Sequence, residues 1–245
     1  MKHLFKILLF LLLPLYGSAA ETNPGGYPFK TDLFLQKQGF TIGYSNKFRQ
    51  ALWVEYTLTA ENLLGRQFSR QNRFKADPAV KKNPVHPREY ARSGYDKGHL
   101  APAADMTYSV QSMIDSFLMT NISPQIPGCN RGIWKRLETQ VRRWAIREER
   151  IRIITGPVFS PPIQYMKRSG LPVPNAFYKV ILDLTPPQKM IAFIVPNKTS
   201  KSQLSSFAVP VKTVENMTGF NFFSELDDNL EKRLKQSSNY EIWDK

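Results

Sequence analysis

The sequence predicts an α+β fold around a mainly antiparallel sheet. The first observation is a set of short runs rich in β-branched and aromatic residues, bounded by Gly and Pro, as is typical of strands. The second is an apolar stripe with helical spacing. The strand runs lie at 41–44, 52–59, 152–158, 177–184 and 189–195, and the stripe lies within 131–149.

The first two runs, 41–44 and 52–59, alternate apolar and polar residues and predict paired strands. Residues 62–95 follow and are polar, basic and interrupted by prolines and asparagines. We expect a long surface loop region here. Loops of this length are more often functional than idle, although the charge could simply keep the protein in solution.

The predicted helix at 131–149 has one apolar face and a basic remainder. Its stripe consists of Ile133, Trp134, Leu137, Val141, Trp144 and Ala145. The three later runs predict buried strands, and residues 211–217, which precede Gly219, predict a short helix.

The N-terminus has the layout of a secretory signal peptide. Lys2 and Lys6 precede an apolar run at 7–16, and small residues follow at 18–20. A membrane anchor is the alternative, but Pro14 interrupts the run, which is shorter than the roughly 20 residues that span a bilayer. We therefore expect a signal peptide at 1–20, an extended arm at 21–38, one domain at 39–245, and a secreted or periplasmic protein without stable membrane insertion.

The chain is strongly basic, with 34 Lys and Arg against 20 Asp and Glu. Removal of Lys2 and Lys6 with the signal lowers the net charge from +14 to +12. Such a field attracts nucleic acid, and it would equally suit an anionic membrane surface or cell-wall polymer. Cys129 is the only cysteine, and the mature chain keeps only His86 and His99. These counts disfavour a Cys/His zinc site and favour a hard, oxygen-bound metal.

Three segments are the most informative for function: 95–105, which contains Asp96-Lys97-Gly98-His99, then 120–125, and 130–138. Together they resemble the DNA/RNA non-specific endonucleases, the family of the Serratia nuclease and mitochondrial endonuclease G. Further matches lie at 155–159, 174–179 and 192–197, and the resemblance covers about 39–226. It implies a ββα-metal nuclease fold, with a central mainly antiparallel sheet flanked by helices.

The resemblance places His99 at the position of the general base. An imidazole has an ordinary pKa near ~6.5 and can take a proton from water at neutral pH. A lone histidine is more often structural, but the Asp96-x-Gly98-His99 motif favours the base. Gly98 would allow a tight backbone path beside it.

Asn130 corresponds to the family's metal-binding asparagine, which implies one Mg²⁺, or Mn²⁺ in its place. A neutral amide oxygen suits a metal that keeps several waters. The alternative is a helix N-cap, for which Asn before a helix is well suited. Glu138, about two turns further on, could reach water bound to that metal, or could pair at the surface with Arg142.

The family's phosphate-binding arginine corresponds to Arg73, with Arg70 and Lys75 as alternatives. Lys97 replaces the usual arginine of the motif and is expected to contact substrate with its charge but without a planar fork. Asp96 is expected to orient its neighbours, and Asn121 to hold the site loop or contact substrate. Both could instead be turn-forming residues.

The sequence therefore predicts a metal-dependent endonuclease that hydrolyses DNA and RNA without sequence preference and leaves 5′-phosphate ends. A secreted, non-catalytic nucleic-acid or polyanion-binding protein of the same fold is the alternative. A serine hydrolase is disfavoured because the sequence contains no Gly-x-Ser-x-Gly motif.

Overall fold

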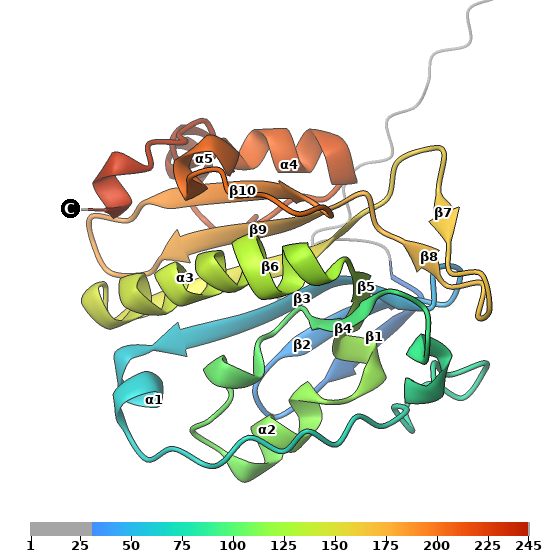
Figure 1. Ribbon diagram of the computed structural model, residues 1–245. Helices are drawn as coiled ribbons and strands as arrows, with labels where there is room; N and C mark the ends of the chain where they lie inside the picture. Colours follow the sequence, from blue (N-terminus) through green and yellow to red (C-terminus); the bar gives the residue numbers. More distant parts are fainter. Residues whose placement is uncertain (1–30, 245) are drawn as a thin grey trace, which may run out of the picture.

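The computed structural model describes residues 31–244, and its central feature is a seven-stranded sheet (Figure 1). The strand order is β1-β2-β3-β6-β9-β10-β11, and every neighbouring pair is antiparallel. The predicted antiparallel α+β architecture is confirmed. The strands are β1 Leu33–Gln36, β2 Thr41–Ser45, β3 Gln50–Thr59, β6 Arg150–Val158, β9 Ala176–Asp183, β10 Met190–Pro196 and β11 Ala208–Val209.

The sheet begins earlier in the chain than the sequence predicts. Strand β1 lies inside the range expected to be an extended arm, yet it pairs with β2 from Leu33↔Tyr44 to Gln36↔Thr41. Its side chains alternate between half-buried and exposed, so the strand forms the edge of the sheet. The boundary near Gly39 is therefore corrected. The predicted signal peptide at 1–20 lies outside the described residues.

Helices pack on the two faces of the sheet and form separate cores. Helix α3, Lys135–Arg147, buries its apolar stripe against one face, where its partners include Tyr56, Ile153 and Ile181. Helices α4, Val211–Thr218, and α5, Asp228–Lys235, contribute to the core on the other face together with Trp53 and Val180. In Figure 1, α3 crosses in front of the sheet, and α4 and α5 lie near its β10 end.

The helix predicted at 131–149 is divided in two. A π-helical turn, η4 Cys129–Trp134, precedes α3, and Gly132 within that turn has non-helical angles of φ −105° and ψ −107°. The predicted apolar stripe is nevertheless buried from Ile133 to Ala145. Asn130 and Glu138 therefore do not share one continuous helix, and their relative positions cannot be derived from helical geometry alone.

The chain between β3 and α3 forms a smaller layer beside the sheet, and it contains most of the residues of the recognised motifs. Its elements are α1 Ala60–Leu64, η1 Pro87–Tyr90, β4 Asp96–His99, η2 Ala103–Asp105, α2 Val110–Ser116, η3 Met119–Asn121 and β5 Ile122–Gln125. The remaining elements are β7 Gln164–Tyr165, β8 Pro172–Val173, η5 Leu204–Phe207 and η6 Glu241–Trp243.

The segment between α1 and β4 is a long surface connection, as predicted. Its basic side chains are all exposed; they are Arg66, Arg70, Arg73, Lys75, Lys81, Lys82, Arg88 and Arg92. The segment is anchored by a few buried residues, among them Asp77 and Tyr90. Among residues 31–244, no helix is both long enough and apolar enough to cross a membrane.

Candidate active site

Strands β4 and β5 form a short antiparallel ladder that ends at His99. The register pairs Asp96 with Gln125 and His99 with Ile122. A Cβ atom at Gly98 would lie 2.1 Å from Oε1 of Gln125, which is far shorter than a van der Waals contact. Gly98 is therefore required because Gln125 packs directly on its backbone, and this close approach fixes the strand that presents His99.

His99 lies between two aromatic rings and keeps an open ring nitrogen. Its ring centroid is 5.5 Å from that of Phe74 and 5.0 Å from that of Phe117. Nε2 is buried without a hydrogen-bond partner, whereas Nδ1 is neither buried nor hydrogen-bonded within the described residues. Burial, with a smaller contribution from the positive charge of Arg70, lowers the pKa of His99 to about 3. The imidazole is therefore neutral at physiological pH, as a general base must be.

Asp96 connects the His99 strand to the turn that carries Asn130. Its Oδ2 accepts hydrogen bonds from Nδ2 of Asn130 at 2.9 Å and from Nε of Arg131 at 2.8 Å. Its Oδ1 accepts from Nη2 of Arg131 at 2.7 Å, so the guanidinium binds both oxygens of the carboxylate. Burial raises the pKa of Asp96, but the hydrogen bonds from Arg131 and Asn130 outweigh it and the pKa is lowered. Asp96 thus stays ionised and orients Asn130.

The side chain of Asn130 does not cap a helix. It lies inside the η4 turn and donates to Asp96, and no side-chain cap bond occurs at the start of η4 or of α3. Because Nδ2 is committed, Oδ1 is the amide atom left for a ligand. Among residues 31–244, no group of three His, Cys, Asp or Glu side chains could hold a metal. A single amide oxygen is a suitable protein ligand for a Mg²⁺ or Mn²⁺ ion that keeps most of its waters. It is not enough for an ion whose ligands all come from the protein.

Glu138 is half-buried on the first turn of α3 and makes no hydrogen bond or ion pair with any described residue. Its alternative partner Arg142 donates instead to Oδ1 of Asp105 at 2.9 Å. Burial raises the pKa of Glu138 to about 7, and Lys179 provides the largest opposing effect. The surface ion pair with Arg142 is therefore absent, and the carboxylate remains available.

Of the three candidate phosphate-binding cations, Arg70 is the one that the structure brings to the site. Its guanidinium lies 5.1 Å from the Phe117 ring, which contacts His99, and its charge acts on both His99 and Glu138. Arg73 and Lys75 are exposed, and their side chains form no hydrogen bond or ion pair with described residues. The sequence analysis favours Arg73 because it matches the upstream arginine of the family.

Lys97 points toward aromatic rings on the same side of the ladder as His99. Its Nζ lies 5.1 Å from the Phe74 ring and 5.8 Å from the Tyr90 ring. Phe74 therefore contacts both Lys97 and His99. The ammonium is held by cation–π contacts next to the proposed base, where it could still meet a phosphate.

The structure corrects the assignment of Asn121 to the substrate-binding set. This side chain is fully buried, and its amide is committed to backbone groups. Nδ2 donates to the carbonyls of Ala101 and Ser116, and Oδ1 accepts from the N–H of Ala101, each at 2.9 Å. Asn121 therefore fixes the loop that follows His99 and has no group to offer a substrate.

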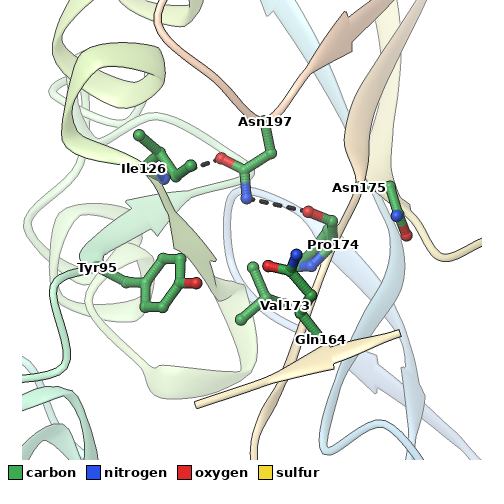
Figure 2. Close-up of a pocket in the computed structure, with 7 residues that line it drawn as sticks. All are labelled: Tyr95, Ile126, Gln164, Val173, Pro174, Asn175 and Asn197. Carbon is green, nitrogen blue, oxygen red and sulfur yellow. Dashed lines mark hydrogen bonds between the residues drawn. The ribbon is translucent and has the colours of Figure 1, made fainter. Parts of the chain in front are cut away.

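A cavity of about 230 Å³ lies beside the ladder but contains none of the predicted site residues (Figure 2). Figure 2 shows Asn197 in the wall of the cavity, hydrogen-bonded to Ile126 and Pro174. Its Oδ1 accepts from the N–H of Ile126 at 2.8 Å, and its Nδ2 donates to the carbonyls of Pro124 and Pro174. The carbonyl of Ile126 in turn accepts from the N–H of Asn130 at 2.9 Å. Asn197 thus anchors the start of the turn that presents Asn130.

Two buried charged residues near the site lie within the matching segments but were given no role by the sequence analysis. Asp105 accepts from Arg142 and from the hydroxyl of Tyr56 at 2.9 Å. Lys179 lies in β9, where it is the only charged residue within the otherwise apolar run from Ala176 to Leu182. That interruption is the sequence signal that could have identified it.

Comparison with known proteins assigns the chain to a family. A family model described as DNA/RNA non-specific endonuclease matches residues 18–229. The chain belongs to this family. As a DNA/RNA non-specific endonuclease, it is a nuclease of the phosphodiester hydrolase class.

Similar proteins include nucleases from fungi and animals. The mitochondrial nuclease of Saccharomyces cerevisiae is 31% identical over 241 residues, with 89% of this chain and 73% of the yeast protein covered. Nuclease C1 of Cunninghamella echinulata var. echinulata is 35% identical, with 79% of this chain and 84% of that protein covered. A chain in the crystal structure of the EndoG/EndoGI complex matches with a TM-score of 0.77 and 27% identity, covering 82% of this chain and 89% of that chain. The endonuclease-type fold expected from the motifs is confirmed.

Proposed function

We propose that this endonuclease cleaves DNA and RNA with His99 as general base and one hydrated Mg²⁺ held by Asn130. The observation that supports this most directly is the pairing of an open, neutral His99 imidazole with an Asn130 amide whose oxygen is left free by Asp96. Mn²⁺ has the same preference for oxygen ligands and could take the place of Mg²⁺.

His99 takes a proton from the attacking water at Nδ1, the ring nitrogen that is not enclosed. The water oxygen forms a bond to phosphorus, the bond to the 3′ oxygen breaks, and that oxygen takes up a proton from solvent. The products are a 5′-phosphate and a 3′-hydroxyl. Arg70 and Lys97 lie near His99 and would balance charge on the phosphoryl oxygens.

A divalent ion bound at Asn130 would supply electrostatic stabilisation of the phosphoryl and leaving oxygens. Glu138 would accept hydrogen bonds from the ion's hydration shell, since its carboxylate has no protein partner among the described residues. Asp96 would hold Asn130 in the ligand orientation.

Substrate recognition would be mainly through phosphates. The eight exposed cations from Arg66 to Arg92 form a surface that could bind a polyanion without reading its sequence.

We also propose export, with cleavage near Ala20 and a secreted or periplasmic mature enzyme. The mature N-terminus, measured by mass spectrometry after expression of the full chain, tests this point.

The proposed activity is tested by incubating supercoiled plasmid and a defined RNA with the protein in EDTA, and then with added Mg²⁺. We expect no cleavage in EDTA, degradation of both substrates with Mg²⁺, and 5′-phosphate ends on the products. Binding of both nucleic acids without any Mg²⁺-dependent cleavage would identify the non-catalytic alternative.

A further inference from the structure

Lys179 is a fully buried lysine with no hydrogen-bond partner for its Nζ. It lies at the centre of β9, on the same side of the strand as Phe177 and Ile181, which belong to the core beneath α3. An ammonium group that is removed from water without a hydrogen bond destabilises the folded state. The position of Lys179 therefore requires a reason other than packing.

The ammonium of Lys179 is surrounded by aromatic rings and by charges from several elements. Its Nζ lies 5.0 Å from the ring of Trp134, in the turn that carries Asn130, and 5.9 Å from the ring of Tyr56 in β3. The charged groups that face it are Glu138 and Arg142 of α3 and Asp105 of η2. Lys179 thus contacts the turn that carries Asn130 and has Glu138 among its charged neighbours.

Of the two acidic neighbours, only Glu138 lacks another partner. Asp105 accepts hydrogen bonds from Arg142 and Tyr56. The groups that face Glu138 are Lys179 of β9, Asp105 of η2, Arg142 of α3 and Arg70 of the surface segment. Burial and Asp105 raise the pKa of Glu138, and Lys179 is the strongest influence that lowers it. Arg142 is already bound to Asp105, whereas the ammonium of Lys179, like the Glu138 carboxylate, has no hydrogen-bond partner among the described residues.

We infer that Lys179 is a positioning residue for the nuclease reaction: its buried ammonium packs on Trp134 and supports the turn that presents Asn130, and it supplies an opposite charge to the Glu138 carboxylate. The inference rests on the proposed function in one respect, the role of Glu138 beside the metal. It predicts that a variant with an apolar residue at position 179 is at least as stable as the wild type but cleaves more slowly, as expected for a group kept for function.

The test compares Lys179→Met and Lys179→Arg with the control Lys235→Met. Lys235 is also buried, but it pairs with Glu215 at 2.6 Å and donates to Asn221 at 2.7 Å, in α5 on the other face of the sheet. Each variant is measured by thermal unfolding at pH 6, by the pH dependence of kcat/KM, and by NMR titration of isotope-labelled glutamate side chains, with Glu138 assigned from Glu138→Gln.

We expect Lys179→Met to melt at or above the wild-type temperature and to raise the Glu138 midpoint by roughly 1 to 2 pH units, the usual effect of losing a nearby opposite charge. The acid limb of kcat/KM should move with it, so the rate at pH 6 falls by about tenfold or more. Lys179→Arg should restore part of both. Lys235→Met should lower the melting temperature and leave the pH profile unchanged.

An unchanged titration midpoint of Glu138 in folded Lys179→Met would overturn the inference. The inference also fails if Lys179→Met shifts the acid limb of kcat/KM equally in the Glu138→Gln background, where residue 138 cannot titrate. The NMR titration needs no turnover. If the wild-type protein cleaves nothing, the proposed function fails, and the coupling of Lys179 to Glu138 is still decided by that titration.

Discussion

Nδ2 of Asn130 donates a hydrogen bond of 2.9 Å to Oδ2 of Asp96, and this bond fixes which atom of the amide faces the site. The relationship joins β4 to the η4 turn, 34 residues later in the chain. Loss of an outer partner that orients a metal ligand usually lowers metal affinity or activity by roughly 10- to 100-fold.

Asp96→Ala should therefore raise the Mg²⁺ concentration for half-maximal rate by roughly 10- to 100-fold, because the Asn130 amide loses its fixed orientation. Arg131→Ala is the matched control, since it removes the exposed partner of Asp96 and keeps the bond to Asn130. Its Mg²⁺ requirement should change much less. Equal Mg²⁺ titrations for Asp96→Ala and wild type would contradict the orienting role.

The pH dependence of kcat/KM should report Glu138 and not His99. The lowered pKa of His99, about 3, keeps the base neutral at all higher pH, so its protonation causes no loss above about pH 4. The raised pKa of Glu138, about 7, means that its carboxylate is lost as pH falls through that region. At saturating Mg²⁺, which favours the carboxylate, we expect the acid limb to lie between the ordinary value near ~4.3 and about 7.

Glu138→Gln should flatten that limb and lower the maximal rate, because a neutral amide cannot titrate. The rates are measured from pH 4.5 to 9 on one defined substrate, with unfolding followed in parallel. An acid limb that keeps its midpoint in Glu138→Gln would assign the titration to another group.

Arg70→Met should reduce kcat/KM by roughly 10²-fold or more, the usual effect of removing a group that stabilises transition-state charge. Arg73→Met removes the same charge three residues away and should change kcat/KM only slightly, because the exposed Arg73 side chain makes no hydrogen bond or ion pair with the described residues. The comparison is made at fixed ionic strength, since both variants weaken general attraction to a polyanion. The reverse order of effects would restore the assignment of Arg73.

Asn121→Ala should destabilise the protein by at least about 2 kcal/mol, because it leaves three buried backbone groups without partners. Activity should fall with the loss of order in the loop after His99. Denaturant unfolding measures the first effect and kcat the second. A stable Asn121→Ala protein with a raised KM and normal kcat would instead indicate direct substrate contact.

The parts of the fold that were predictable have their signal within a single segment. Strands β3, β6, β9 and β10 are marked by their own β-branched and aromatic residues, and α3 by its stripe. The four-residue strand β1 is defined by pairing with β2, which no local pattern encodes. The break at Gly132 also escapes prediction, because the apolar spacing continues across it.

The site follows the same division. His99 and Asn130 belong to recognisable motifs, and the structure adds the link between them through Asp96, which lies on the His99 strand and binds Asn130. The bond from Asn130 to Asp96, the preference for Arg70 over Arg73, and the burial of Asn121 all arise from long-range packing. The surroundings of Lys179 come from elements in several regions of the chain, so its role could not be assigned from the sequence, although it ends a matching segment and interrupts an apolar strand.

The most direct test of the proposed mechanism is the single-turnover rate of Mg²⁺-dependent cleavage by His99→Ala, compared with wild type on one defined DNA. We expect a rate lower by roughly 10²- to 10⁴-fold, the range for loss of a general base. The Mg²⁺ concentration for half-maximal rate should stay close to wild type, because the ring makes no hydrogen bond with the described residues. The melting temperature is measured in parallel, because the substitution removes the ring contacts with Phe74 and Phe117. Cleavage by folded His99→Ala at the wild-type rate would contradict the central claim.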